Sequence, residues 1–155
     1  MPNLSLANNV STESGRQMLK VISATFGSSA DGFSAVNANI SALVTKRLRV
    51  TALSAHGYAY QTFTVTPGVT YEFWYKWIQV GGADQGQGAI KVGHSTDDEA
   101  YINGSIASGA ATFTSPRVTI TPTESTLTIK MSTQSVGEHT YWDDVYLNEW
   151  DGTPV

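Results

Sequence analysis

The stretch Gly57–Trp77, GYAYQTFTVTPGVTYEFWYKW, decides the fold class. Side-chain types alternate along Tyr58–Thr66, and the alternation resumes along Val69–Val80. A period of two over this length is typical of a β-strand with one face on a core. Pro67-Gly68 between the two runs fits a type II turn, because proline presets φ and glycine accepts a positive φ. The stretch therefore predicts strand, tight turn and strand, in an all-β chain built from antiparallel hairpins.

The second run also predicts which side chains enter the core. Between residues 71 and 77, one parity carries only large aromatic side chains, at Tyr71, Phe73, Tyr75 and Trp77. The other parity mixes polar and apolar residues and includes Trp74. Since successive side chains of a strand point to opposite faces, we expect the four aromatics in the core and Trp74 on the outside.

About ten short strands, separated by turn-prone clusters, predict an antiparallel β-sandwich of the jelly-roll type. The chain has 155 residues, which suits one domain. We expect an irregular N-terminal arm over residues 1–16, a jelly-roll domain over residues 17–149 and a C-terminal tail over residues 150–155. Asn103-Gly104-Ser105 is interpreted as a turn. The predicted strands are Leu19–Phe26, Asn37–Val44, Arg47–Leu53, Tyr58–Thr66, Val69–Val80, Ala89–His94, Ala110–Thr114, Arg117–Thr121, Thr126–Ser132 and Thr140–Glu149.

Composition excludes several kinds of site. The chain contains no cysteine, so disulfides, thiolate zinc sites and a cysteine nucleophile are excluded. The formal net charge is −4 and no basic stripe is present, so no nucleic-acid partner is expected. No run approaches the length of a membrane span, and MPNLSLANNV does not read as a secretory signal, so no membrane partner is expected.

No enzyme signature is present either. Asp97, Asp98 and Glu99 are consecutive, whereas a glycosidase pair needs two carboxyl groups that face each other across a cleft. His56 and His94, like His139, lie far apart without the spacing of a metal site. No nucleophile elbow or phosphate-binding loop occurs. We therefore expect a protein that binds rather than catalyses.

The last strand, Thr140–Glu149, places a carboxylate on an apolar face. Asp143 shares a parity with Val145 and Leu147, whereas Trp142, Asp144 and Tyr146 share the other. A carboxylate near a core needs hydrogen-bond donors or a cation. Asp143 is therefore either held by backbone amides and hydroxyl groups or bound to a structural ion.

Exposed aromatic side chains are the candidates for sugar binding, because their faces stack on pyranose rings while amides read hydroxyl groups. Two alternatives stay open for each: packing under the chain's own loops, or contact with another subunit. Trp150, on the C-terminal tail, is a candidate contact to a partner. The candidates for glycan binding are Trp74 and Trp142 on outward parities, then Tyr58, Tyr60 and Tyr101, with Gln61, Gln85 and Gln87 as polar neighbours.

Four short motifs in order, Leu48–Thr51, Gly57–Phe63, Pro67–Phe73 and Trp142–Leu147, resemble the jelly rolls of carbohydrate-binding modules of the family 4/9/22 type. Asp31–Ala38 resembles their strand entry, and Asn3-Leu4 their N-terminal opening. The resemblance implies a β-sandwich and a glycan ligand. In such modules a calcium ion often joins the N-terminal strand to an aspartate of the last strand. Asp143 or Asp144 matches the second half of that site, whereas Asn8 and Glu13 replace the first half only approximately, so calcium stays open.

The same motifs are similar to domains of structural proteins of tailed bacteriophages. This resemblance implies a non-enzymatic virion protein: a capsid decoration or cement protein, or a tail-fibre or tail-appendage subunit. We expect other virion proteins as partners, location in the virion, and a homo-oligomer, with a trimer as the first guess. The alternative is a glycan-binding module that recognises host-surface or plant-type polysaccharide.

Overall fold

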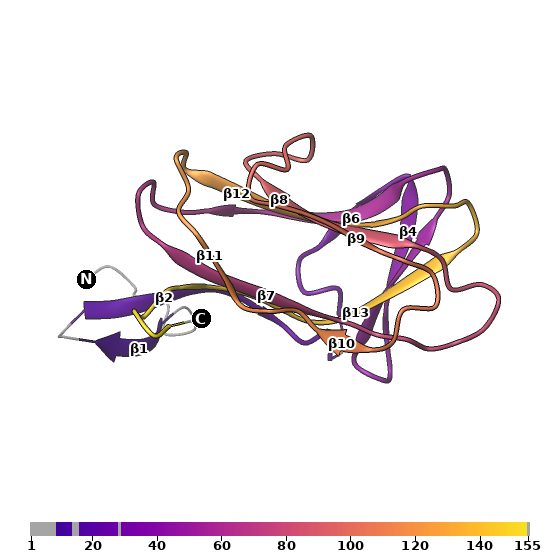
Figure 1. Cartoon of the computed structure of the whole chain (residues 1–155), viewed down its shortest axis with the longest axis horizontal. Helices are drawn as coiled ribbons and strands as arrows, with labels where there is room; N and C mark the ends of the chain where they lie inside the picture. The colour runs from indigo at the N-terminus through magenta and orange to yellow at the C-terminus, as the bar shows by residue number, and fades with distance from the viewer. Residues whose placement is uncertain (1–8, 14–15, 28, 155) are drawn as a thin grey trace.

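The computed structural model describes residues 9–13, 16–27 and 29–154, with the strand path alone for residues 9–24. These residues contain thirteen strands in two sheets that stack as a sandwich (Figure 1). Every strand pairing among them is antiparallel. No helix that could cross a membrane occurs in this part of the chain. The predicted all-β antiparallel sandwich is confirmed.

The smaller sheet has five strands and the larger has eight. In spatial order, the smaller sheet consists of β3 (Ser34–Val36), β6 (Gly57–Thr64), β12 (Thr126–Thr133), β8 (Gly88–Gly93) and β9 (Ile102–Ile106). The larger sheet consists of β1 (Asn9–Glu13), β2 (Arg16–Ala24), β4 (Ala38–Leu43), β5 (Arg47–Ala52), β7 (Tyr71–Trp77), β10 (Phe113–Thr114), β11 (Val118–Ile120) and β13 (His139–Glu149).

The core lies between the sheets and contains the aromatic residues predicted from β7. Tyr71, Phe73 and Trp77 are buried, and Tyr75 is half-buried against the core. The facing sheet contributes aliphatic side chains of alternating positions, which include Leu127, Ile129 and Met131 of β12 and Ile90 and Val92 of β8.

The predicted turn at Pro67-Gly68 is confirmed, but the predicted hairpin is wrong. The Val69 N–H donates to the Thr66 carbonyl at 3.1 Å, and Gly68 has φ of 81°, as the third residue of a type II turn requires. The turn joins β6 of the smaller sheet to β7 of the larger sheet. The chain therefore crosses from one layer to the other here, instead of folding back on its neighbour.

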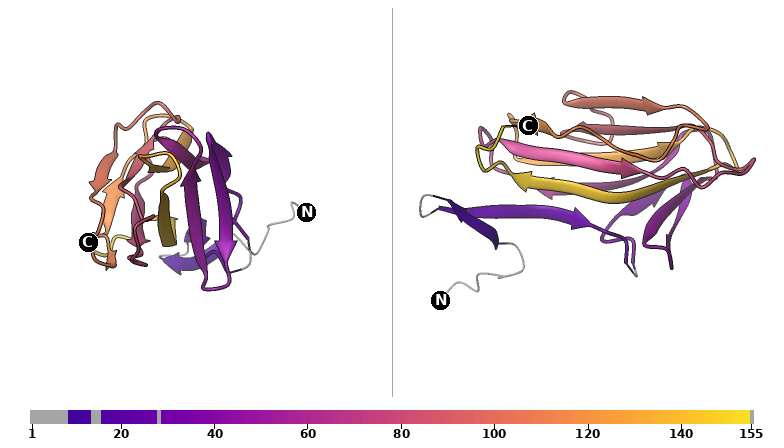
Figure 2. Two further views of the ribbon diagram at one scale, coloured as in Figure 1. Left: turned by 90° about the vertical axis from the view of Figure 1, so that its right-hand side faces the viewer. Right: turned by 60° about the horizontal axis from the view of Figure 1, so that its bottom comes forward.

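Some short strands escaped the sequence prediction. Asn103-Gly104-Ser105 lies inside β9 and not in a turn, because β9 pairs with β8 at the edge of the smaller sheet. β1 lies inside the predicted irregular arm, and it pairs with β2 at the outer edge of the larger sheet, away from the smaller one (Figure 2). The Asn3-Leu4 opening and Asn8 lie outside the described residues.

A β-bulge in β13 reverses the predicted parity of the residues before it, whereas Val145 and Leu147 after it face the core as predicted. Asp143 pairs with Lys76 and Tyr146 with Trp74, so three steps along β13 match two along β7. Asp144 is the extra residue of the bulge, and its φ is 45°. Trp142 therefore points into the core and is 0% exposed, while Val145 beyond the bulge points inward as well. The prediction that Trp142 faces outward is wrong.

Candidate functional site

A groove crosses the outward face of the smaller sheet, and small side chains form its floor. Register places Ser132 of β12 opposite Tyr58 of β6 on one side and Ala89 of β8 on the other, with Ser105 of β9 beyond Ala89. Because Ser132, Ala89 and Ser105 are small and lie side by side on neighbouring strands, they leave a trough that runs across the strands. Over four strands the trough is about 14 Å long, from the usual spacing between strands.

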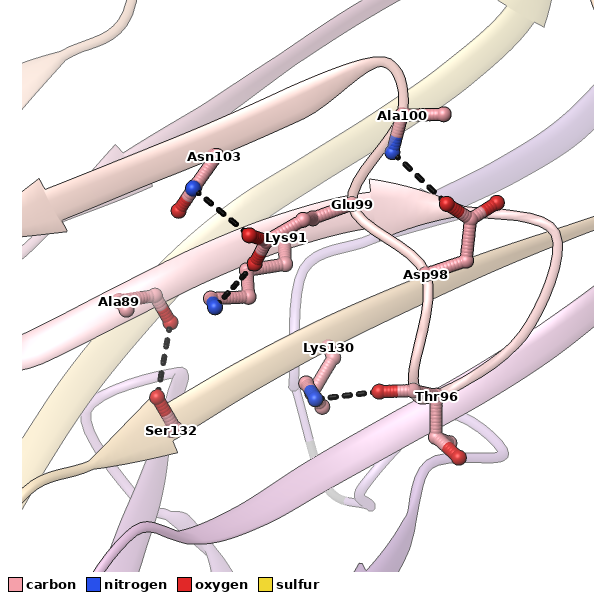
Figure 3. A network of polar contacts seen from close by, with 9 residues as sticks. All are labelled: Ala89, Lys91, Thr96, Asp98, Glu99, Ala100, Asn103, Lys130 and Ser132. Carbon is pink, nitrogen blue, oxygen red and sulfur yellow. Dashed lines mark hydrogen bonds and ion pairs between the residues drawn. The ribbon is translucent and has the colours of Figure 1, made fainter.

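One wall of the groove is a row of longer side chains, two residues further along each strand. Lys130 of β12 lies directly opposite Lys91 of β8, and Lys91 lies opposite Asn103 of β9. Figure 3 shows these three side chains on adjacent strands, beside the loop that follows β8.

The other wall is formed by loop residues that lie next to the ends of the same strands. His56, Gln134 and Gln87 line this side, together with Ala107. Backbone bonds tie the three loops together, from His56 N–H to the Gln134 carbonyl at 2.9 Å and from Gln134 N–H to the Gln87 carbonyl at 3.0 Å. The groove has a volume of about 670 Å³, within the usual range for ligand sites.

Residues 94–100 form a loop above the lysine row, and its own hydrogen bonds hold it in shape. The Asp98 carboxylate accepts the backbone N–H of His94 at 2.7 Å and that of Ala100 at 3.0 Å. These bonds, with the one from His94 first, hold the pKa of Asp98 below its ordinary value. The His94 ring bonds the Thr126 carbonyl and the Tyr101 hydroxyl, both at 3.0 Å. The loop is thereby fixed to β12.

The loop supplies a partner to each lysine (Figure 3). The Lys91 ammonium pairs with the Glu99 carboxylate, which also accepts the Asn103 amide N–H at 3.0 Å. The Lys130 ammonium donates to the Thr96 carbonyl and lies 5.0 Å from the centre of the Tyr58 ring. Burial, followed by the charge of Lys91, lowers the pKa of Lys130 from its ordinary value.

The structure brings Tyr58 of the predicted sugar-binding residues into this groove, and Gln87 with it. Tyr60 lies on the same outward face in the lysine row, and its ring meets that of Tyr58 edge-on at 6.0 Å. Gln61 does not join them: it is half-buried on the inward parity of β6, beside Gly32. Gln85 is buried and bonds to the backbone of the loop after β7.

The tryptophan candidates lie elsewhere. Trp142 is a core residue with no face open to a ligand. Trp74 lies on the outward face of the opposite sheet, where its ring stacks on Tyr146 at 4.5 Å between centroids. Trp150, predicted to contact a partner, is half-buried, and its indole N–H donates to the Thr153 carbonyl at 2.7 Å. The tail thus folds back on itself here, and the partner contact stays a prediction.

Asp143 and Asp144, the calcium candidates, lie at the β-bulge. The Asp143 carboxylate accepts the Asp144 N–H at 2.9 Å, so a backbone amide holds it, one of the two predicted alternatives. Burial raises the pKa of Asp143, the neighbouring Asp144 adds to this, and Lys76 and Arg47 oppose it. Among the described residues no three carboxylate or histidine side chains gather into a metal site.

The lysines, His56, Gln134 and Asn103 were missed as site residues. The sequence pattern does predict that the Lys91 and Lys130 side chains point outward, because apolar residues flank them in Ile90-Lys91-Val92 and Ile129-Lys130-Met131. Their meeting across β8 and β12 depends on register between strands that are distant in sequence. No local pattern carries that information.

Comparison with known proteins identifies relatives of the fold alone. No family model matches the sequence, and no curated protein sequence is similar to it. The CBM22-1 xylan-binding domain of Paenibacillus barcinonensis Xyn10C superposes with a TM-score of 0.60 at 12% identity, over 86% of this chain and 96% of that one. A module titled TmCBM61, in complex with β-1,4-galactotriose, has a TM-score of 0.52 at 14% identity, over 76% and 87%.

A longer structure also matches. The CBM22-1–GH10 modules of Clostridium thermocellum xylanase 10B, complexed with xylohexaose, superpose with a TM-score of 0.59 at 16% identity. The match covers 88% of this chain but only 29% of that one, so the chain spans less than a third of the matched protein. Taken with the sheet order and the buried aromatic core, these likenesses show that the chain has the jelly-roll fold of carbohydrate-binding modules.

Proposed function

We propose that the protein is a non-catalytic glycan-binding module whose ligand lies in the groove across the smaller sheet. The observation that carries the proposal is the groove itself: a trough about 14 Å long, with Tyr58 at one end, serine hydroxyl groups on its floor, and amide and ammonium groups along its walls. An extended chain of sugar rings suits this shape better than a compact ligand does. The structural neighbours include modules titled as xylan-binding or as complexes with β-1,4-galactotriose, which favours the same ligand class.

The groove lining favours binding over hydrolysis. The described residues that line it include no carboxylate. Glycosidases require a pair of carboxyl groups on either side of the scissile bond. Serine, amide and tyrosine side chains instead supply hydrogen bonds and one stacking surface, as in a recognition site.

Isothermal titration with a panel of soluble polysaccharides, xylan and galactan among them, tests the proposal. We expect at least one of them to bind, and Tyr58→Ala to weaken the binding by about 1 kcal/mol, roughly five-fold, through loss of ring contact. The matched control is Trp74→Ala on the opposite sheet, which should bind like the parent. Absence of binding across the panel, or equal losses in the two variants, refutes the proposal.

We further propose that the protein is carried on a virion, as the phage-like motifs imply. Adhesion to glycans and attachment to a particle are compatible, since one face of the sandwich could bind sugar while another contacts neighbouring subunits. Mass spectrometry of purified particles tests this second proposal, and absence of the chain from them would end it.

A further inference from the structure

The charged residues that line the groove are both lysines. Lys91 and Lys130 face each other across adjacent strands, which places like charges side by side. Directly opposed like charges are destabilising in a sheet. His56 lines the opposite wall, and the described lining contains no acidic residue. The protein as a whole has a net charge of −4. The loop that contacts the lysines carries Asp97, Asp98 and Glu99, so the positive charge is confined to the residues that line the groove.

The two ammonium groups are not equally neutralised. Lys91 pairs with Glu99. Lys130 contacts a neutral carbonyl and an aromatic face, and it forms no ion pair with any described residue. Burial, followed by the charge of Lys91, lowers the pKa of Lys130, and the charges of Asp97 and Glu99 oppose this shift. An ammonium has three N–H donors, and the Thr96 carbonyl uses one of them. Lys130 thus offers a cation and free donors to the groove.

From this arrangement we infer that the preferred ligand is an anionic polysaccharide, whose carboxylate or sulfate group lies against Lys130 and Lys91. The inference rests on the proposed function, since it names the substrate class of the same groove. An anionic group would relieve the repulsion between the two lysines and complete the hydrogen bonds of Lys130. The Tyr58 ring and the hydroxyl-lined floor would contact the sugar that bears it.

The position of the lysines also limits the register of the ligand. They lie in the middle of the sheet, on β12 and β8, with Tyr58 to one side and Asn103 at the far edge. The charged unit therefore binds near the centre of the groove, and neutral units extend toward its ends. A ligand with a charge on every sugar unit can place only one or two of its charges against the two lysines. The affinity should therefore stop rising once the ligand carries more charges than these.

The test compares polysaccharides with the same backbone and different charge: polygalacturonate against its methyl ester, and dextran sulfate against dextran. We expect at least one charged form to bind about ten-fold tighter than its neutral partner. Lys130→Gln should lower the affinity for that form about ten-fold and lower the affinity for the neutral form clearly less, because hydrogen bonds to charged groups are the stronger ones. A preference for polygalacturonate assigns a carboxylate, and one for dextran sulfate assigns a sulfate.

Lys46→Gln is the matched control, since it removes one positive charge from the exposed turn between β4 and β5. It should leave all affinities unchanged. Lys91→Gln, on the neighbouring strand, provides a second groove variant and should lower the affinity for the charged form as well. Equal losses from Lys46→Gln and Lys130→Gln would mean diffuse attraction, and would overturn the inference.

The failures of the two proposals are distinguishable. If neutral polysaccharides bind in a way that depends on Tyr58, and the charged forms bind no better, the inference is wrong while the proposed function stands. If no polysaccharide binds, charged or neutral, both are wrong.

Discussion

A directed chain of three hydrogen bonds crosses the core and makes a sharp prediction for Thr140. The Thr133 hydroxyl donates to the Val50 carbonyl at 2.8 Å. A hydroxyl has one hydrogen, so the 2.8 Å contact between Thr133 and Thr140 must be donated by Thr140. The Trp142 indole N–H then donates to the Thr140 oxygen at 2.9 Å. All three side chains are fully buried, and the chain joins β12 of one sheet to β13 and β5 of the other.

Thr140→Val keeps the shape of the side chain and removes the middle of this chain. The indole N–H of Trp142 loses its acceptor in a buried site, which costs about 1–3 kcal/mol. The Thr133 oxygen loses a donor but keeps its own bond to Val50, which adds a smaller cost. We expect a loss of about 2–3 kcal/mol in the free energy of unfolding, which lowers the urea midpoint by about 1 M. Thr140→Ser, which keeps the hydroxyl, should lose less.

A double-mutant cycle with Trp142→Phe isolates the indole bond. Trp142→Phe alone is destabilising, because it removes core volume. In that background no N–H is left without an acceptor, so Thr140→Val should cost at least about 1 kcal/mol less than in the parent. Urea unfolding of the four proteins, followed by circular dichroism, gives the coupling. An equal cost of Thr140→Val in both backgrounds refutes the hydrogen-bond argument.

Further changes test packing, the groove and the bulge. Gly57→Ala should cost about 3 kcal/mol or more, because its Cβ would lie 2.1 Å from the Asn37 carbonyl oxygen, whereas Gly27→Ala, with nothing within 4 Å, should be near neutral in thermal unfolding. Ala89→Phe should fill the groove floor and abolish glycan binding in titration, with no loss of stability. Burial raises the pKa of Asp143 above its ordinary value of 3.8, so the folded protein holds the proton of this carboxyl group more tightly than the unfolded chain does. The contribution of Asp143 to the free energy of unfolding is therefore fully present below pH 3.8, and it is lost as the pH rises through the raised pKa. Asp143→Asn should therefore stabilise the protein at neutral pH, and a gain that persists unchanged below pH 3.8 in acid-range melts would contradict this.

Local alternation was sufficient to predict strands and core residues, but not strand neighbours. The residues of β7 were assigned correctly because period-two patterning depends only on which face meets the core. The same pattern cannot say whether β6 and β7 share a sheet, because a Pro-Gly turn fits either a hairpin or a crossing between layers. Only tertiary pairing, here β6 with β12 and β7 with β13, separates the two.

The error at Trp142 has a local cause. The prediction assumed that side chains alternate between the two faces without interruption from Val145 back to Trp142. The bulge breaks this alternation, because one inserted residue moves every earlier side chain to the opposite face. Asp144 adopts positive φ there, and aspartate is among the few side chains that tolerate it. Nothing in the letters Trp-Asp-Asp-Val marks the second aspartate as the inserted residue. The bulge also lies where β13 exchanges β5 for β2 as its neighbour, which is a tertiary event.

The groove depends on two levels of structure, and this separates its affinity from its selectivity. Its floor follows from small residues at paired positions of neighbouring strands, and changes in the surrounding loops leave this floor in place. Its charged wall depends on the loop of residues 94–100, since the Thr96 carbonyl orients Lys130 and Glu99 orients Lys91. That loop is held by the Asp98 carboxylate and the His94 ring. Groups held before the ligand arrives cost less ordering on binding. Loosening the loop should therefore weaken discrimination between charged and neutral sugars more than it weakens binding itself.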